Sequence, residues 1–88
     1  MNHTEQLIAD SWYEVLNAEG LEVSRDELDA SSDYFALGGD SFQVVLVVTL
    51  LERALKTTVP VRWVFQAPST VEALAQRIDA GDADDGDA

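Results

Sequence analysis

The sequence predicts an all-α domain, a four-helix bundle with three longer helices and one short helix. Apolar residues recur at helical spacing in three segments, and residues typical of helix ends flank these segments. With 88 residues, the chain has room for one domain with one core. We place this domain at residues 1–80, and we expect residues 81–88, which consist of Gly, Asp and Ala, to form a disordered acidic tail.

The first helix is predicted over residues 5–19. Thr4 is the expected N-cap, and Gly20 is a typical residue just after a helix end. The apolar positions that match one helix face are Leu7, Ile8, Trp12, Val15 and Leu16.

A long loop is predicted over residues 20–39, where Ser, Asp and Gly are frequent and no helical period is sustained. Loops of this length are uncommon in compact domains and usually have a function. We expect Phe35 and Leu37 to anchor the loop to the core, and Leu28 to do the same.

The second helix is predicted over residues 41–56. Its β-branched start, Val44 to Val48, would by itself favour a strand. However, the apolar segment continues to Leu55, which is long for a strand. Asp40 can cap a helix at this point, and basic residues near the far end suit the helix dipole.

A short helix is predicted over residues 61–66 and a last long helix over residues 70–80. Ser69 and Glu72 have the spacing of a capping box at the start of the last helix. Its apolar positions repeat at helical spacing: Val71, Leu74, Ala75 and Ile78.

The composition excludes several function classes. Seventeen acidic residues against five basic ones give a net charge of -12, so nucleic acid and anionic membrane surfaces are not expected partners. Without cysteine there is no disulfide, thiolate nucleophile or cysteine metal site. No signal peptide or membrane span is visible, which predicts a cytoplasmic protein. The aspartates of the tail lack the later glutamate of a calcium loop, so no metal site is expected.

Ser41 follows a Gly-Gly-Asp turn at the mouth of the second helix, where a serine is exposed and approachable. A catalytic serine needs a nearby base, and the only histidine is His3, close to the N-terminus. We therefore predict no catalytic residue and no enzyme activity. An alternative is that Ser41 only helps to cap the helix beside Asp40.

The segment Leu37-Gly38-Gly39-Asp40-Ser41 resembles the phosphopantetheine attachment motif of carrier proteins. Its double glycine is similar to that of the peptidyl carrier (thiolation) domains of non-ribosomal peptide synthetases. The likeness extends over residues 5–80, through the lead-in from Asp33 and the region that follows Val59. The resemblance implies an acyl-carrier-like four-helix bundle.

The resemblance also implies a cofactor, 4'-phosphopantetheine, which a phosphopantetheinyl transferase moves with Mg²⁺ from coenzyme A to the Ser41 hydroxyl. Gly39 and Asp40 would form the site with it. The thiol of the arm would carry aminoacyl or peptidyl groups as thioesters for non-ribosomal biosynthesis of antibiotics and other secondary metabolites. The missing cysteine and the missing base fit this function, since the cofactor brings the sulfur and the transferase brings the chemistry.

Besides the transferase, the resemblance implies an adenylation enzyme or domain and a condensation, thioesterase or tailoring enzyme, such as an oxidase, as partners of a monomeric carrier. Two alternatives stay open. One is an acyl or aryl carrier of polyketide or siderophore-type biosynthesis. The other is an acidic helical interaction domain that carries nothing and in which Ser41 is only a cap.

A helical wheel separates two faces of the second helix. Its core face is expected to comprise Val44, Val47, Val48, Leu51 and Leu55. Phe42, Val45 and Leu46 then lie on the exposed side, which suggests a docking patch beside Ser41. The alternatives are that the helix is buried all round or that Phe42 folds back over the loop. Phe42 and Trp63 depart from the pattern of the family, and Trp63 is either a core residue or an aromatic anchor for a partner.

A small basic group lies close to the end of the second helix: Arg53, Lys56 and Arg62. Charge compensation at the helix end is the plain explanation for it. The resemblance makes Arg62 a candidate partner contact as well.

Overall fold

The computed structural model describes residues 1–81 and contains four α-helices in this part of the chain. They are α1 (His3–Ala18), α2 (Val44–Leu55), α3 (Arg62–Phe65) and α4 (Val71–Ala80), with a short 3₁₀ helix, η1 (Arg25–Glu27), in the first connection. Residues 1–81 hold no strand, only one isolated bridge. The prediction of an all-α fold with three longer helices and one short one is confirmed.

Residues 82–88 lie outside the described residues, and the predicted acidic tail falls there apart from Gly81. This glycine ends α4 in a left-handed conformation, with a φ of 64°. None of the helices within residues 1–81 is long and apolar enough to cross a membrane.

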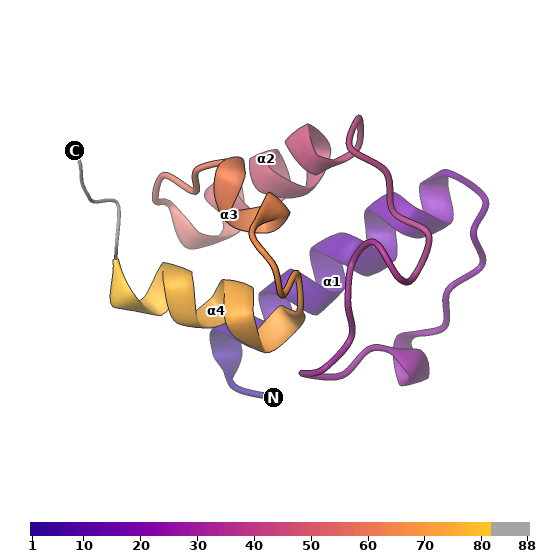
Figure 1. Ribbon diagram of the computed structural model, residues 1–88, viewed down its shortest axis with the longest axis horizontal. Helices are drawn as coiled ribbons and strands as arrows, with labels where there is room; N and C mark the ends of the chain where they lie inside the picture. The colour runs from indigo at the N-terminus through magenta and orange to yellow at the C-terminus, as the bar shows by residue number, and fades with distance from the viewer. Residues whose placement is uncertain (82–88) are drawn as a thin grey trace.

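The core lies around α1, which packs against both α2 and α4 (Figure 1). In the figure, α2 and α4 each run opposite to α1. At one end of the bundle the Thr4 hydroxyl donates a hydrogen bond of 2.6 Å to Asp79, which joins the start of α1 to the end of α4. The fully buried large side chains include Ile8, Trp12, Leu16, Tyr34, Leu51 and Leu74. Burial of this apolar set is the main force that holds the bundle together.

The N-cap of α1 is Asn2, and the prediction of Thr4 was wrong. Asn2 has an extended backbone, and its side chain accepts a hydrogen bond of 2.8 Å from the Glu5 amide. The Glu5 carboxylate in turn accepts a bond of 2.9 Å from the Asn2 amide, which completes a capping box. Thr4 lies inside the helix, where its hydroxyl bonds to α4 instead.

The start of α2 was predicted three residues too early, because residues 41–43 form a turn before the helix begins at Val44. Its end at Leu55 agrees with the prediction within one residue. Lys56 follows in a left-handed conformation, with a φ of 56°, and this conformation terminates the helix.

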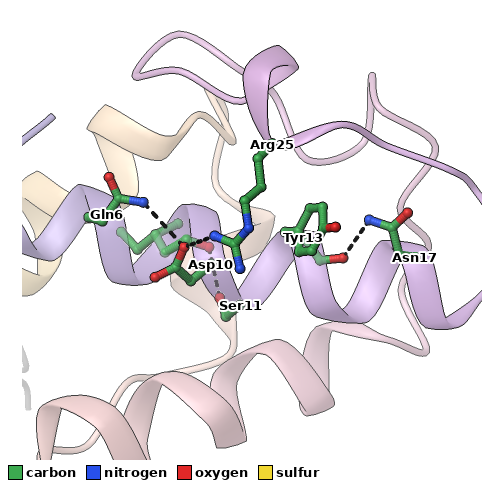
Figure 2. A network of polar contacts seen from close by, with 7 residues as sticks. Gln6, Asp10, Ser11, Tyr13, Asn17 and Arg25 are labelled. Carbon is green, nitrogen blue, oxygen red and sulfur yellow. Dashed lines mark hydrogen bonds and ion pairs between the residues drawn. The ribbon is translucent and has the colours of Figure 1, made fainter.

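The first half of the long loop is fixed to α1 by polar contacts (Figure 2). Arg25 of η1 forms an ion pair with Asp10, and its guanidinium lies 4.3 Å from the centre of the Tyr13 ring. The Asn17 amide donates to the carbonyls of Tyr13 and Val23, at 2.8 and 2.9 Å. Leu28, buried as predicted, adds an apolar anchor.

The second half of the loop is tied to the start of α4. The Tyr34 amide donates to the Ser69 carbonyl at 3.0 Å, and the Val71 amide donates to the Ser32 carbonyl at 3.1 Å. The Glu72 amide likewise donates to the Ala30 carbonyl at 2.9 Å, so two loop carbonyls accept amide groups that the first turn of a helix leaves without partners. Thr70, not Ser69 as predicted, is the N-cap, because its hydroxyl accepts the Ala73 amide at 3.2 Å. The Ser69 hydroxyl is buried and donates to the Gln66 carbonyl.

The anchors at the end of the loop differ in part from the prediction. Leu37 is half-buried and packs on the core, as expected, but Phe35 is 36% exposed. The neighbouring Tyr34 is fully buried in its place. One residue of the pair turns inward and the next turns outward, so only one of the two rings enters the core.

Candidate functional site

Tyr34 supports the segment that precedes Ser41. Its ring packs edge to face against Trp12, with the ring centres 5.4 Å apart. Its hydroxyl donates to the Asp40 carbonyl at 3.2 Å, and its own carbonyl accepts the Gly39 amide at 3.1 Å. The loop therefore crosses directly over a buried aromatic ring and is bonded to that residue at two points.

The two glycines of the motif are needed for different reasons. Gly38 has a φ of 104°, a left-handed conformation that L side chains rarely adopt. Gly39 is the point of close approach, because a Cβ atom there would lie 2.5 Å from the Tyr34 ring. The double glycine thus combines one conformational requirement with one steric requirement.

The Ser41 side chain is exposed, and no group of residues 1–81 hydrogen-bonds to its hydroxyl. Asp40 was predicted to cap α2, but the N-cap position is Gln43, which makes no side-chain cap bond. The Asp40 carboxylate orders the preceding turn instead, since it accepts the Gln43 amide at 3.1 Å. The alternative that Ser41 serves as the cap therefore has no support. His3 lies at the start of α1, and α2, which Ser41 precedes in the chain, begins at the opposite end of the bundle (Figure 1).

Three exposed apolar side chains follow Ser41 in the chain, one in the turn before α2 and two in the first turn of the helix. Phe42 is 88% exposed, Val45 57% and Leu46 55%. Their exposure agrees with the helical wheel, and Phe42 does not fold over the loop. The opposite face is buried at Val44, Val47, Val48 and Leu51, with Leu55 half-buried. The partner-binding role of the exposed side chains stays a prediction.

Trp63 lies in the core, and its assignment as a partner-binding residue is not supported by its position. Only 5% of its surface is exposed, because the single turn of α3 directs Trp63 and Val64 inward. Arg77 of α4 holds this turn in place by donating to the carbonyls of Trp63 and Gln66, at 2.8 and 3.2 Å. Arg62 is exposed at the start of α3 and remains a candidate contact.

A second exposed aromatic feature was not predicted from the sequence. Phe35 of the loop stacks on Phe65 of α3, with ring centres 5.8 Å apart and an interplanar angle of 24°. Both rings are partly exposed.

The small basic group at the end of α2 makes no ion pair within residues 1–81: Arg53, Lys56 and Arg62. The ion pair in this part of the chain joins Arg25 to Asp10. Residues 1–81 also hold no cluster of three or more His, Asp or Glu that fits a metal ion.

Comparison with protein families decides what this arrangement is. Residues 6–78 match the family described as "Phosphopantetheine attachment site", so the match includes the Gly-Gly-Asp-Ser turn, all of α2 and α3, and most of α1 and α4. The chain belongs to this phosphopantetheine-attachment family. Its members bear covalently attached 4'-phosphopantetheine.

Curated relatives of this phosphopantetheine-attachment domain are much longer proteins. It is 35% identical over 79 residues to nonribosomal peptide synthetase ataP of Aspergillus terreus, with 90% of the chain aligned to 5% of that protein. It is 36% identical to surfactin synthase subunit 1 and 30% identical to subunit 3 of Bacillus subtilis, over 88% and 94% of the chain but 2% and 6% of those proteins. The chain therefore spans only a small part of each relative. No solved structure gave a significant match.

The residues at the turn fit the cofactor of the family. Attachment needs a hydroxyl that is accessible and not engaged by the protein, and Ser41 offers one. Gly39 keeps the adjacent backbone free of a side chain, and Asp40 orders the turn. Domains of this family are generally non-catalytic and work with partner enzymes.

Gly39→Ala should destabilise the domain by about 1–3 kcal/mol, since the new methyl group would overlap the Tyr34 ring. Urea unfolding measures this loss. In a Tyr34→Leu background the same substitution should cost clearly less, because the smaller side chain leaves room for the methyl group. Equal costs in both backgrounds would show that the ring does not set the requirement for glycine.

Alkaline pH should destabilise the domain through Tyr34. Burial, with the negative charges of Asp40 and Glu19 in smaller roles, raises the pKa of Tyr34 from 10.0 to about 12. The folded domain then keeps a phenolic proton that the unfolded chain loses. The free energy of unfolding should therefore fall between pH 10 and pH 12, by an amount on the order of 2 kcal/mol.

Urea unfolding of the wild type and of Tyr34→Phe at pH 8, 10 and 11 tests this dependence. The variant has no phenolic proton at this position, so its stability should decline less over the same pH range. Parallel profiles for the two proteins would contradict the assignment to Tyr34.

Proposed function

We propose that this domain is a peptidyl carrier, that Ser41 is the residue that receives 4'-phosphopantetheine, and that the cargo is delivered to enzymes of non-ribosomal peptide biosynthesis or tailoring. The observation that carries the site assignment is the exposed Ser41 hydroxyl, free of hydrogen bonds within residues 1–81, inside the matched family region. The relatives named above are peptide synthetases, which favours a peptidyl carrier over an acyl or aryl carrier.

The residues of the chain have a presenting role in this function. Tyr34 fixes the backbone at Gly39 and Asp40, and Asp40 fixes the turn that follows. Ser41 is thereby held at a defined place on the surface. When attached, the cofactor supplies a thiol that holds an aminoacyl or peptidyl group as a thioester. No side chain of the site is placed to activate the Ser41 hydroxyl, so we assign that chemistry to the transferase and expect no catalytic activity of the domain itself.

Partner enzymes are proposed to dock on Phe42, Val45 and Leu46, with Arg62 as a further contact. The first three form an exposed apolar patch next to the serine. The phosphopantetheinyl transferase, an adenylation enzyme, and a condensation, thioesterase or tailoring enzyme are the proposed partners. The chain's net charge of -12 favours partner surfaces with a basic or neutral rim. The monomeric state and the cytoplasmic location stay predictions.

Ser41→Ala should abolish attachment of the cofactor. The wild type, incubated with coenzyme A, Mg²⁺ and a broad-specificity phosphopantetheinyl transferase, should gain the mass of one phosphopantetheine group. Ser31→Ala is the matched control, since Ser31 is also exposed and lies in the long loop that precedes Ser41. It should be modified like the wild type. An unmodified wild type, or full modification of Ser41→Ala, would sink the proposal.

Phe42→Ala should weaken the complex with the transferase by about 1–2 kcal/mol, which is roughly a 5- to 30-fold higher Kd. Titration calorimetry with the unmodified domain measures the Kd, and circular dichroism should be unchanged because the ring makes little contact with the fold. Gln76→Ala, an exposed site on α4, serves as the control. An unchanged Kd for Phe42→Ala removes this residue from the docking surface.

A further inference from the structure

A groove of about 280 Å³ lies between the C-terminal half of α1 and α2. Its floor is apolar and comes from Val15 and Ala18 of α1 and from Leu46 and Leu50 of α2. A smaller hollow of about 170 Å³, also lined by Leu50, lies further along the same pair of helices. The lining residues of the larger groove come from the last two turns of α1 and the C-cap residue after it, and from the first, middle and last turns of α2.

An apolar row leads from beside Ser41 into this groove. Leu46 and Leu50 of the groove are four residues apart and so lie about one turn apart on α2, and the exposed Phe42 lies in the turn that leads from Ser41 into this helix. Leu46 lies in the first turn of α2, five residues after Ser41 in the chain. The groove is slightly smaller than common small-molecule sites, which measure roughly 300–1,000 Å³. It therefore suits a group the size of one amino-acid residue.

The edges of the groove carry opposite charges. Glu14 and Glu19 line it on the α1 side and Arg53 lines it on the α2 side. Neither glutamate forms an ion pair with a residue of the described part of the chain, residues 1–81. The groove thus suits a ligand that joins a cation to an apolar group. The two carboxylates attract the cation to the α1 side, and the positive charge of Arg53 repels it from the α2 side.

We propose that this groove binds the aminoacyl group carried on Ser41, with an apolar side chain on the floor and the free ammonium group beside Glu14 and Glu19. The inference rests on the proposed carrier function and adds a class of cargo to it. An aminoacyl thioester keeps its ammonium group, whereas an N-acylated cargo has none. The groove therefore distinguishes these two cargoes by charge.

Nuclear magnetic resonance of three loaded forms tests the proposal. The transferase attaches pantetheine from coenzyme A analogues that carry no cargo, a leucyl group or an N-acetylleucyl group, with an amide in place of the hydrolysable thioester. Intact mass verifies each attachment before the spectra are recorded. Relative to the form without cargo, the leucyl form should shift the signals of Ala18, Leu46 and Leu50. The N-acetylleucyl form should shift them less.

Variants assign these shifts to the groove. Ala18→Leu fills it and should remove the shifts, whereas the rest of the spectrum stays as in the wild type. Glu14→Gln and Glu19→Gln should each lower the equilibrium constant for cargo binding about two- to five-fold, as expected for an exposed ion pair. Glu72→Gln, an exposed carboxylate on α4, should change nothing.

Attachment without shifts in the groove, shifts on another face, or equal shifts for the two cargoes would overturn this proposal and leave the carrier function intact. Failure of the attachment itself, seen first by mass, would overturn the carrier function and this inference together.

Discussion

The contact between the Tyr34 ring and the backbone at Gly39 determines where Ser41 lies. The ring is fully buried against Trp12 and leaves no room for a side chain at Gly39, and its hydroxyl holds the Asp40 carbonyl. A buried aromatic residue thus connects the core of the bundle to an exposed turn. The rigid packing of protein interiors gives this turn a defined position, although its serine is open to solvent.

The helices were predictable from the spacing of apolar residues, but their first residues were not. Asn2, Thr4, Ser69 and Thr70 are all acceptable caps by residue type. The choice among them depends on tertiary contacts: Thr4 bonds to Asp79, and the segment before α4 pairs with the long loop. Likewise, Tyr34 and Phe35 are adjacent aromatic residues, and only the path of the loop decides which one enters the core.

The candidate site was accessible to sequence reasoning because its signals are local. A Gly-Gly-Asp-Ser turn before an apolar helix marks the serine, and a single periodicity separates the buried face of α2 from its exposed side chains. Trp63 shows the limit of such reasoning, since a four-residue helix is too short for a periodic pattern to distinguish inward from outward. The groove beside α1 was missed because it depends on how two helices pack, and neither helix encodes it alone.

The hydrogen bond between Thr4 and Asp79 brings the two ends of the described segment, residues 1–81, together at the start of α1. Ser41 belongs to the other end, and the 16 residues of α1 span about 24 Å between them. A tether attached at either chain end would hold the domain at this end of the bundle, which would then be the pivot for a rotation of the whole domain. A rotation of about 20° at that pivot would sweep the serine through roughly 8 Å, as follows from the helix length. The orientation of such a tether would thus select which surface the serine reaches, with no change inside the bundle.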